Sequence, residues 1–469
     1  MKINLNNITG SFNLFIKSIP DIKQPTLISF AFRLNSSDKF SVITQLNELF
    51  DDIFLFQTVS DQVTLIGLNS TINLQPVNAR KFSEVIDNYN YWKKNFINNW
   101  PAKNKTNTPL IFCTTKFDPT NYSSMWNDYE PLRIYVPELI FSFVNNYIIG
   151  YYNFTIDKDR MTDSHLNKLN SYLKSFVELK TNSSIPSEVM TYSQSIVEHK
   201  NIKNWDEITS EAFRRIEIGE ISKLVLSRTY TLNLSSKLNW KILLRNLNER
   251  FPDCYLFFIK KNNSIFFGSS PEMFLKVSNK IAEVESVAGS AARGEQTESD
   301  NELENNLKMS AKNHQEHLFV SDFITNILLT YSDDVRVIEE KQIRKLENIQ
   351  HLITRISAEL NSTENLFELI DALFPTPAVC GIPKEKAIEL IRKIENYDRG
   401  LYSGLIGMID FECNCEIAVA IRSALVKENN LTAFAGAGLL NGSDPKEEFL
   451  ETELKLNTIL SLFFDENKS

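Results

Sequence analysis

Short apolar segments recur through the first 155 residues. They are rich in β-branched and aromatic residues, are separated by Asn, Asp and Pro, and include PTLISFAFRL, QVTLIGL and YIIGYYNF. This pattern predicts strands joined by turns. Helical spacing of apolar residues predicts helices at 39–50, 80–98, 160–180 and 204–219. The polar stretch at 181–193 is the candidate domain crossing.

From Lys223 onward, longer predicted strands alternate with longer predicted helices. KLVLSRTYTLNL, CYLFFIK and IFFGSS are predicted strands, and a long helix is predicted at about 300–330. Helices at 364–372 and 384–395 precede three predicted strands, YSGLIGMIDF, EIAVAIRSALV and LTAFAGAGLL. A last helix at about 445–464 has a clear start, because Ser443 or Asp444 can cap it and Pro445 suits its first turn. The chain is therefore predicted to be α+β, with antiparallel sheets covered by helices.

Composition narrows the class of protein. The 469-residue chain is 42% hydrophobic, which is enough for a large core, and its formal net charge is −9. Net negative charge argues against nucleic acid or an anionic membrane as a partner, so an acidic ligand would need a local cationic site. The sequence has no basic signal segment, no apolar stretch of membrane-spanning length and no zinc pattern among its five cysteines. We therefore expect a cytoplasmic protein.

The last predicted helix carries the sharpest local pattern. In SDPKEEFLETELK, the spacing of Glu448, Glu451 and Lys455 places all three on one helix face, just after Ala435-Gly436-Ala437-Gly438. Carboxylates at this spacing suit a hard cation such as Mg2+. A solvated face with a Glu–Lys pair is the commoner use of the same pattern.

Three other charged residues are candidates for chemistry. Lys223 opens an apolar strand, where its amine can reach solvent or be held partly out of water as a base. Glu272 follows a Ser-Ser-Pro turn, where a buried carboxyl group can keep a proton and donate it. Arg422, in EIAVAIRSALV, can pair with a protein carboxylate or with a ligand carboxylate. For each residue taken alone, the structural role is the commoner one.

The long predicted helix contains a fourth candidate. Glu316, in SAKNHQEHLFVSDF, is either a surface carboxylate or a metal ligand. His317 beside it fits a hydrogen-bonded structural role, because no second histidine follows at ligand spacing. Tyr402, predicted on the strand before Arg422, can hydrogen-bond the same group as that arginine or be structural.

Two glycine-containing segments superficially suggest phosphate loops. AGSAARG at 288–294 and AGAG at 435–438 lack both the GKS/T ending and the G-x-G-x-x-G pattern, so nucleotide binding is not predicted. Backbone amides near Gly289, Gly436 and Gly438 can still approach a carboxylate closely.

Taken together and in order, these segments resemble the chorismate-utilising enzymes, which include isochorismate, salicylate, anthranilate and aminodeoxychorismate synthases. The matching blocks are KLVLSR, FFGSSPEMFLKV, AGSAARG, SAKNHQEH, IQHLITRISAEL, LFPTPAVCGIP, DRGLYSGLIGMID, EIAVAIRSALV and AFAGAGLLNGSDPKEEFLETELK. The resemblance implies an α+β fold like that of anthranilate synthase component I, with two large antiparallel sheets packed face to face and flanked by helices. Residues 1–200 are expected to form its N-terminal β-rich part and 201–469 its chorismate-binding catalytic region.

The resemblance also implies roles for single residues. Lys223 matches the general base that activates water at chorismate C2, and Glu272 matches the general acid for the departing C4 hydroxyl. The matches to Mg2+ ligands are Glu316 and Glu451, with Glu448 nearby. The matches to substrate-binding residues are Gly289, Ser290, His351, Tyr402, Arg422, Gly436, Gly438 and Lys455. Mg2+, Arg422 and Lys455 would offset the charge of a dianionic substrate.

The lysine at position 223 distinguishes among the relatives, because ammonia-using members carry glutamine there. The expected enzyme is an isomerase that converts chorismate reversibly to isochorismate with Mg2+, feeding menaquinone synthesis, as a monomer without a glutamine amidotransferase. The alternatives are a salicylate synthase, a siderophore-pathway isochorismate synthase and a catalytically silent chorismate-binding subunit. Three departures from the family pattern occur: Phe374 replaces His, Asn313 replaces an acidic residue, and Cys113-Thr114 replace Gly-Gly.

Overall fold

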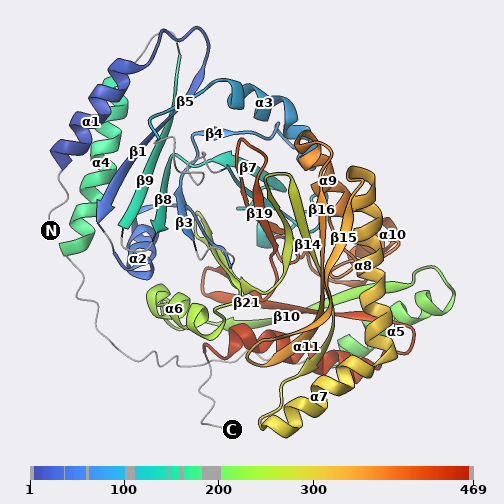
Figure 1. The fold of residues 1–469 in the computed structure, drawn as a ribbon. Helices are drawn as coiled ribbons and strands as arrows, with labels where there is room; N and C mark the ends of the chain where they lie inside the picture. Colours follow the sequence, from blue (N-terminus) through green and yellow to red (C-terminus); the bar gives the residue numbers. More distant parts are fainter. Residues whose placement is uncertain are drawn as a thin grey trace.

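The computed structural model describes residues 5–35, 37–59, 63–100, 111–144, 147–157, 162–181 and 202–463. Within these residues the chain forms two large sheets, of twelve and nine strands, with helices around them (Figure 1). The predicted crossing at 181–193 lies, apart from its first residue, outside the described residues.

The larger sheet joins strands from both ends of the chain. Its order is β17-β10-β21-β20-β12-β11-β2-β3-β8-β9-β1-β5, and all of its pairs are antiparallel except β1 with β5. Its strands are β1 (Thr26–Asn35), β2 (Asp52–Gln57), β3 (Thr64–Leu68), β5 (Phe96–Asn98), β8 (Leu139–Val144), β9 (Tyr147–Ile156), β10 (Lys223–Asn233), β11 (Tyr255–Lys261), β12 (Ser264–Ser270), β17 (Gly381–Ile382), β20 (Ser423–Lys427) and β21 (Asn430–Leu440). The pairing of β11 with β2 makes one continuous sheet of the earlier and later segments.

The smaller sheet is antiparallel throughout, in the order β15-β16-β14-β13-β19-β18-β6-β7-β4. Its strands are β4 (Ile72–Asn73), β6 (Ile111–Thr115), β7 (Leu132–Val136), β13 (Met273–Ser278), β14 (Ile281–Ala292), β15 (Val335–Lys345), β16 (Ile349–Glu359), β18 (Leu405–Ile409) and β19 (Cys415–Val419). A buried aromatic core joins the two sheets. For example, Phe54 of β2 meets Phe112 of β6 with ring centroids 4.6 Å apart, a geometry that adds to the benefit of burial.

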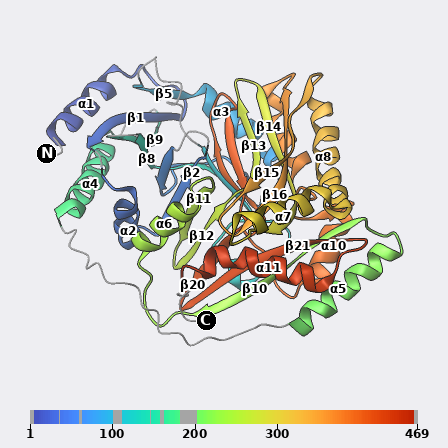
Figure 2. The same cartoon turned by 60° about the horizontal axis from the view of Figure 1, so that its bottom comes forward.

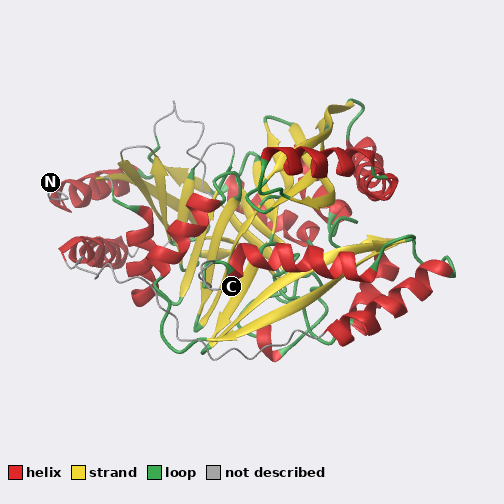
Figure 3. Cartoon of the chain, turned by 90° about the horizontal axis from the view of Figure 1, so that it is seen from below, coloured by secondary structure: helices red, strands yellow, loops and turns green. Residues whose placement is uncertain are grey.

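Helices lie around both sheets (Figure 3). They are α1 (Leu5–Ser18), α2 (Lys39–Leu49), α3 (Ile86–Lys94), α4 (Thr162–Thr181), α5 (Ile202–Glu217), α6 (Trp240–Arg250), α7 (Thr297–Met309), α8 (Ala311–Tyr331), α9 (Leu366–Leu373), α10 (Lys384–Ile394) and α11 (Pro445–Leu460). Helix α11 lies along β21 beside α5, whereas α7 and α8 pack on β14 (Figure 2). The predicted α+β fold with two large antiparallel sheets is confirmed.

Several predicted elements need correction. The helix predicted at 300–330 is two helices, because Ser310 ends α7 and its side chain caps α8 by accepting from the Asn313 amide. The helix predicted at 80–98 ends at Lys94 and gives way to β5. Helices α1 and α6 were not predicted. The start of α11 is as predicted, since Asp444 accepts from the amides of the first turn.

The predicted strand EIAVAIRSALV is also two strands, because at its break the chain passes from the smaller sheet to the larger one. Pro271 and Glu272 connect β12 to β13, and the segment ending at Arg422 connects β19 to β20. The two crossings are tied together, because the Ser269 amide donates to the Arg422 carbonyl (3.1 Å) and the Val419 amide donates to the Glu272 carbonyl (3.1 Å). Arg422 has a left-handed backbone conformation (φ 51°), which a non-glycine residue keeps only where its surroundings fix it.

Candidate active site

A pocket opens where the two crossings meet α8 and α11. All of the predicted site residues except Lys223 and Glu448 line it. The crossings therefore bring together side chains that are far apart in the sequence.

Lys223 lies just behind the pocket wall, at the first position of β10, and is completely buried. Its Nζ is 3.0 Å from Oε1 of Glu316, which does line the pocket. No hydrogen bond of acceptable geometry reaches this nitrogen from any residue that the structure describes. Buried polar groups nearly always have a partner, so this amine has the capacity to bind a water or a ligand atom.

Glu272 lines the pocket and is 5% exposed. Burial, and secondly the negative charge of Glu285, raise the pKa of Glu272 to about 7. Three cations act against this shift: Lys455, Lys223 and Arg344. A carboxyl group with a pKa near 7 holds its proton in much of the population at neutral pH, as a general acid must.

The three predicted metal ligands are each ion-paired with a lysine. The pairs are Glu316 with Lys223, Glu448 with Lys312, and Glu451 with Lys455 at 2.6 Å. Burial and the charge of Glu451 raise the pKa of Glu448. Burial also acts to raise the pKa of Glu451, but the ion pair with Lys455 outweighs it and that pKa is lowered. Across the described parts of the chain, no three His, Cys, Asp or Glu side chains form a metal cage as they stand.

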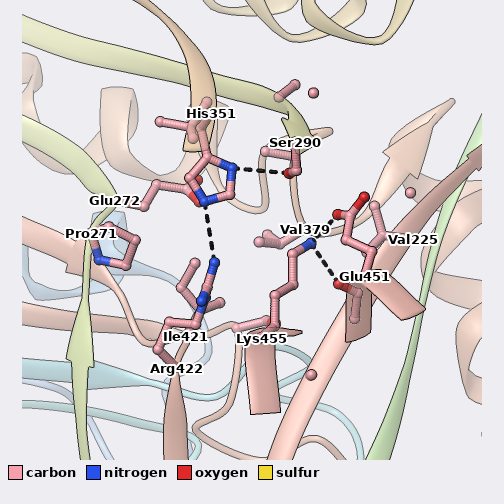
Figure 4. Close-up of a pocket in the computed structure, with 18 of the residues that line it drawn as sticks. Val225, Pro271, Glu272, Ser290, His351, Val379, Ile421, Arg422, Glu451 and Lys455 are labelled. Atoms are coloured by element: carbon pink, nitrogen blue, oxygen red, sulfur yellow. Dashed lines mark hydrogen bonds and ion pairs between the residues drawn. The ribbon is translucent and has the colours of Figure 1, made fainter. Parts of the chain in front are cut away.

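A chain of hydrogen bonds crosses the pocket from Arg422 (Figure 4). Arg422 donates to Thr458 Oγ1 (3.0 Å) and to His351 Nε2 (3.1 Å), so its direct partners are a hydroxyl and an imidazole rather than a carboxylate. Because a guanidinium group only donates, His351 carries its proton on Nδ1 and donates it to Ser290 Oγ (2.9 Å). Burial, and then the charge of Arg422, lower the pKa of His351 well below its usual range. The histidine is therefore neutral and has a fixed tautomer.

The glycines of β21 allow two side chains to approach the strand. Pairing with β20 stops at Phe434, so the strand beyond it faces the pocket on one side. A Cβ at Gly436 would lie 3.1 Å from the Tyr402 hydroxyl, and one at Gly438 would lie 2.5 Å from Glu316 Oε1. The Gly436 carbonyl accepts from Lys455 Nζ (2.8 Å).

One predicted site residue lies on a different element from the one expected, and another lies at a strand bulge. Tyr402 lies in the turn before β18 rather than on a strand, and its ring stacks on Phe434 (5.2 Å between centroids). Gly289 lies at a bulge of β14 between Val287 and Ser290, with φ of +82°, a conformation that favours glycine. The bulge directs Ser290 towards His351 across the β14–β16 pair.

Sequence reasoning missed Lys312, which pairs with Glu448. It lies one helical turn before Glu316 in SAKNHQEH, so helical spacing could have identified it. The structural role expected of His317 is confirmed, since it contacts the Ala288 carbonyl (3.2 Å) and Thr354 Oγ1 (2.7 Å).

The residues that depart from the family pattern lie outside the pocket lining. Phe374 packs edge-on against Phe274 (6.1 Å between centroids), and Cys113 is a buried residue of β6. Neither residue lines the pocket, nor does Asn313.

Comparison with known proteins shows which family and which relatives the sequence of this chain matches. A family model described as "chorismate binding enzyme" matches residues 14–464. Isochorismate synthase MenF of Bacillus subtilis is 26% identical over 96% of this chain and 96% of its own length.

Two solved structures have the same fold as this chain. The menaquinone-specific isochorismate synthase MenF of Escherichia coli superposes with a TM-score of 0.79 at 20% identity, covering 98% of this chain and 99% of that one. Anthranilate synthase component I of Streptococcus pneumoniae superposes with a TM-score of 0.63 at 20% identity, covering 95% and 93%. Among the described residues, no helix is long and apolar enough to cross a membrane.

Proposed function

Because the chain belongs to the chorismate-binding enzyme family, we propose that its pocket converts chorismate to isochorismate. One observation carries the proposal: a buried carboxyl group with a pKa near 7 lines a pocket that also holds Arg422 and Lys455, and a buried lysine amine lies just behind the wall of that pocket. The similarity to isochorismate synthase MenF of Bacillus subtilis over nearly the full length of both chains supports this choice within the family.

The reaction needs one base and one acid. Lys223, as the free amine, takes a proton from a water molecule, whose oxygen forms a bond to C2 of the ring. The ring double bond shifts, the bond between C4 and its hydroxyl oxygen breaks, and Glu272 gives that hydroxyl a proton so that it leaves as water. One water enters and one leaves, so substrate and product are isomers and no redox cofactor is required.

The cationic side chains account for how an acidic protein binds a dianion. Among the residues that the structure describes, Arg422 has no carboxylate as a hydrogen-bond partner, and it is 4% exposed, so its charge is available to a ligand carboxylate. Lys455 and Tyr402 lie on the same pocket, beside the open edge of β21. We assign to these residues the binding of the side-chain carboxylate of chorismate.

The acidic residues fit Mg2+ in their donor chemistry. Glu316, Glu448 and Glu451 offer the oxygen ligands that this ion prefers. Burial and then repulsion from Glu451 raise the pKa of Glu448, and a divalent cation would relieve that repulsion. When bound, Mg2+ supplies positive charge for the ring carboxylate of the substrate. The lysines that now pair with these residues, Lys312 among them, would have to give up those contacts.

The wider setting is part of the same proposal. We place the enzyme in menaquinone synthesis, in the cytoplasm, as a monomer that works without a glutamine amidotransferase. The lysine at position 223 supports the last point, since water rather than ammonia is the nucleophile.

Product identification tests the function. The purified chain is incubated with chorismate and Mg2+, and the products are separated by chromatography. Isochorismate, in equilibrium with chorismate, is the expected product. Salicylate together with pyruvate would identify a salicylate synthase, and absence of any turnover would identify a silent chorismate-binding protein.

A further inference from the structure

Behind the pocket, Arg344 of β15 links Glu285 of β14 to the turn that carries Glu272. Its Nη1 donates to the main-chain carbonyl of Pro271 (2.7 Å) and to Glu285 Oε2 (2.8 Å), and its Nη2 donates to Glu285 Oε1 (2.6 Å). The side chain of Glu285 is 4% exposed and that of Arg344 is 22% exposed. The ion pair is therefore bidentate and largely withdrawn from water, where such pairs are strong.

The hydrogen bond from Arg344 to the Pro271 carbonyl is one of three that hold the main chain of the turn carrying Glu272. The Glu272 amide donates to Ser270 Oγ (3.2 Å), and the Glu272 carbonyl accepts from the Val419 amide (3.1 Å). Arg344 holds the remaining carbonyl, that of Pro271, from the edge strand of the smaller sheet. The ion pair between Arg344 and Glu285 does not require a third partner. The additional hydrogen bond from Arg344 to the Pro271 carbonyl therefore connects this ion pair to the turn that carries Glu272.

We propose that Arg344 and Glu285 are a positioning pair for Glu272, in which Arg344 fixes the turn through the Pro271 carbonyl and the two opposite charges set the surroundings of the Glu272 carboxyl group. The inference rests on the proposed function, in which Glu272 is the general acid. It adds two residues that lie outside the pocket lining and outside the blocks of the family resemblance.

The charges of the pair act on Glu272 in opposite directions. Glu285 raises the pKa of Glu272 and Arg344 lowers it. The charged and titratable groups around Glu272 come from five strands or helices and from the connection between β19 and β20. They are Glu285, Arg344, Lys223, Lys455, His351 and, in that connection, Arg422. Arg355 also donates to Glu285 Oε1 (3.1 Å), so Glu285 keeps a cationic partner when Arg344 is replaced.

Single substitutions should therefore move the pH profile of kcat in opposite directions. Glu285→Gln leaves the charge of Arg344 uncompensated, so Glu272 loses its proton at lower pH and the alkaline limb shifts down by roughly one pH unit. Arg344→Gln removes the positive charge and keeps the negative charge of Glu285. Glu272 then loses its proton at higher pH, and the alkaline limb shifts up by roughly one pH unit. Only Arg344→Gln also frees the Pro271 carbonyl, so only this variant should lose maximal rate, by about tenfold or more.

The double variant separates charge from position. In Glu285→Gln with Arg344→Gln, both charges are gone, so we expect the pH profile to return towards that of the wild type while the loss of rate remains. Lys345→Gln is the matched control: it removes one positive charge from the neighbouring position of β15, where the side chain pairs with Asp300 and Glu304. It should change neither the profile nor the rate.

The proposal is overturned if the two single variants shift the limb in the same direction, if neither shifts it, or if Lys345→Gln shifts it equally. Should Arg344→Gln fail to fold, Glu285→Gln alone still tests the sign. Infrared titration of the Glu272 carboxyl, identified by its loss in Glu272→Gln, reads the effect of the pair without turnover. If the two single variants shift this infrared titration in opposite directions, the proposal of a positioning pair is supported. If Glu272→Gln retains turnover, only the role of Glu272 as the general acid is rejected.

Discussion

Lys223 Nζ and Glu316 Oε1 lie 3.0 Å apart, so the proposed base and a proposed metal ligand form one ion pair. One comes from the start of β10 and the other from the second turn of α8. Gly438 allows this contact, because a Cβ there would lie 2.5 Å from the same glutamate oxygen and 3.1 Å from Lys223 Cε. Any cation that binds Glu316 competes with the amine for that oxygen.

Lys223→Ala should abolish turnover and leave chorismate binding measurable. Removal of a general base typically costs about 10²–10⁴ in rate, while Arg422 and Lys455 remain to bind the substrate. Isochorismate formation gives the rate, and calorimetry gives the affinity. Lys237→Ala, at an exposed position, is the control. Full turnover in Lys223→Ala would reject the base assignment.

Glu272→Gln should remove the acid and also change how stability depends on pH. The pKa of Glu272 in the folded chain is about 7, above the ordinary value of 4.5, so the folded state binds this proton more tightly than the unfolded state. The wild type should therefore lose up to about 3 kcal/mol of stability relative to the variant as pH rises from 4.5 to 7. Thermal unfolding of both proteins across this range measures the difference. Parallel curves would contradict the raised pKa.

Glu316→Gln should weaken Mg2+ binding by tenfold or more, since it removes one of the proposed carboxylate ligands. Titration of Mg2+ by calorimetry gives the affinity without turnover, and chelation of Mg2+ from the wild type should stop isochorismate formation. The control is Glu304→Gln on α7, where the carboxylate pairs with Lys308 and Lys345. Equal Mg2+ affinity in the wild type and Glu316→Gln would exclude this ligand.

Arg422→Gln should weaken chorismate binding by about 10- to 100-fold, the value of a buried charge-assisted hydrogen bond. His351 would also lose the donor that fixes its tautomer. Arg336→Gln, at a side chain 72% exposed, should bind normally. An unchanged dissociation constant in Arg422→Gln would mean that the substrate carboxylate binds elsewhere.

Two glycines offer a matched pair of alanine substitutions. Gly438→Ala places a methyl group against Glu316 and Lys223, so we expect loss of turnover with an intact fold. Gly10→Ala, in α1, meets nothing within 4 Å and should stabilise the chain by about 0.5–1 kcal/mol. Circular dichroism and unfolding curves report the fold, and product formation reports the site. Normal turnover in Gly438→Ala would show that the close approach is not needed.

Local features of the fold could be predicted where neighbouring residues decide them. The cap of α11 depends on Asp444 and Pro445, which adjoin the helix, and the sequence was sufficient for both. The face shared by Glu451 and Lys455 follows from helical spacing alone, and the two side chains do pair. By contrast, EIAVAIRSALV has the apolar pattern of one strand. The residues on both sides of its break are buried, so the sequence does not show that the chain passes from one sheet to the other there.

The sequence by itself determined the α+β class, the family and most of the pocket lining, because these depend on local periodicity and on motifs in order. Only the tertiary structure decided that Arg422 donates to Thr458 and His351, that Lys223 pairs with Glu316, and that Arg344 and Glu285 lie behind Glu272. Such partners come from strands and helices that are distant in the chain. Coulomb and hydrogen-bond energies depend on distances of a few ångströms, and the packing of the two sheets alone sets those distances.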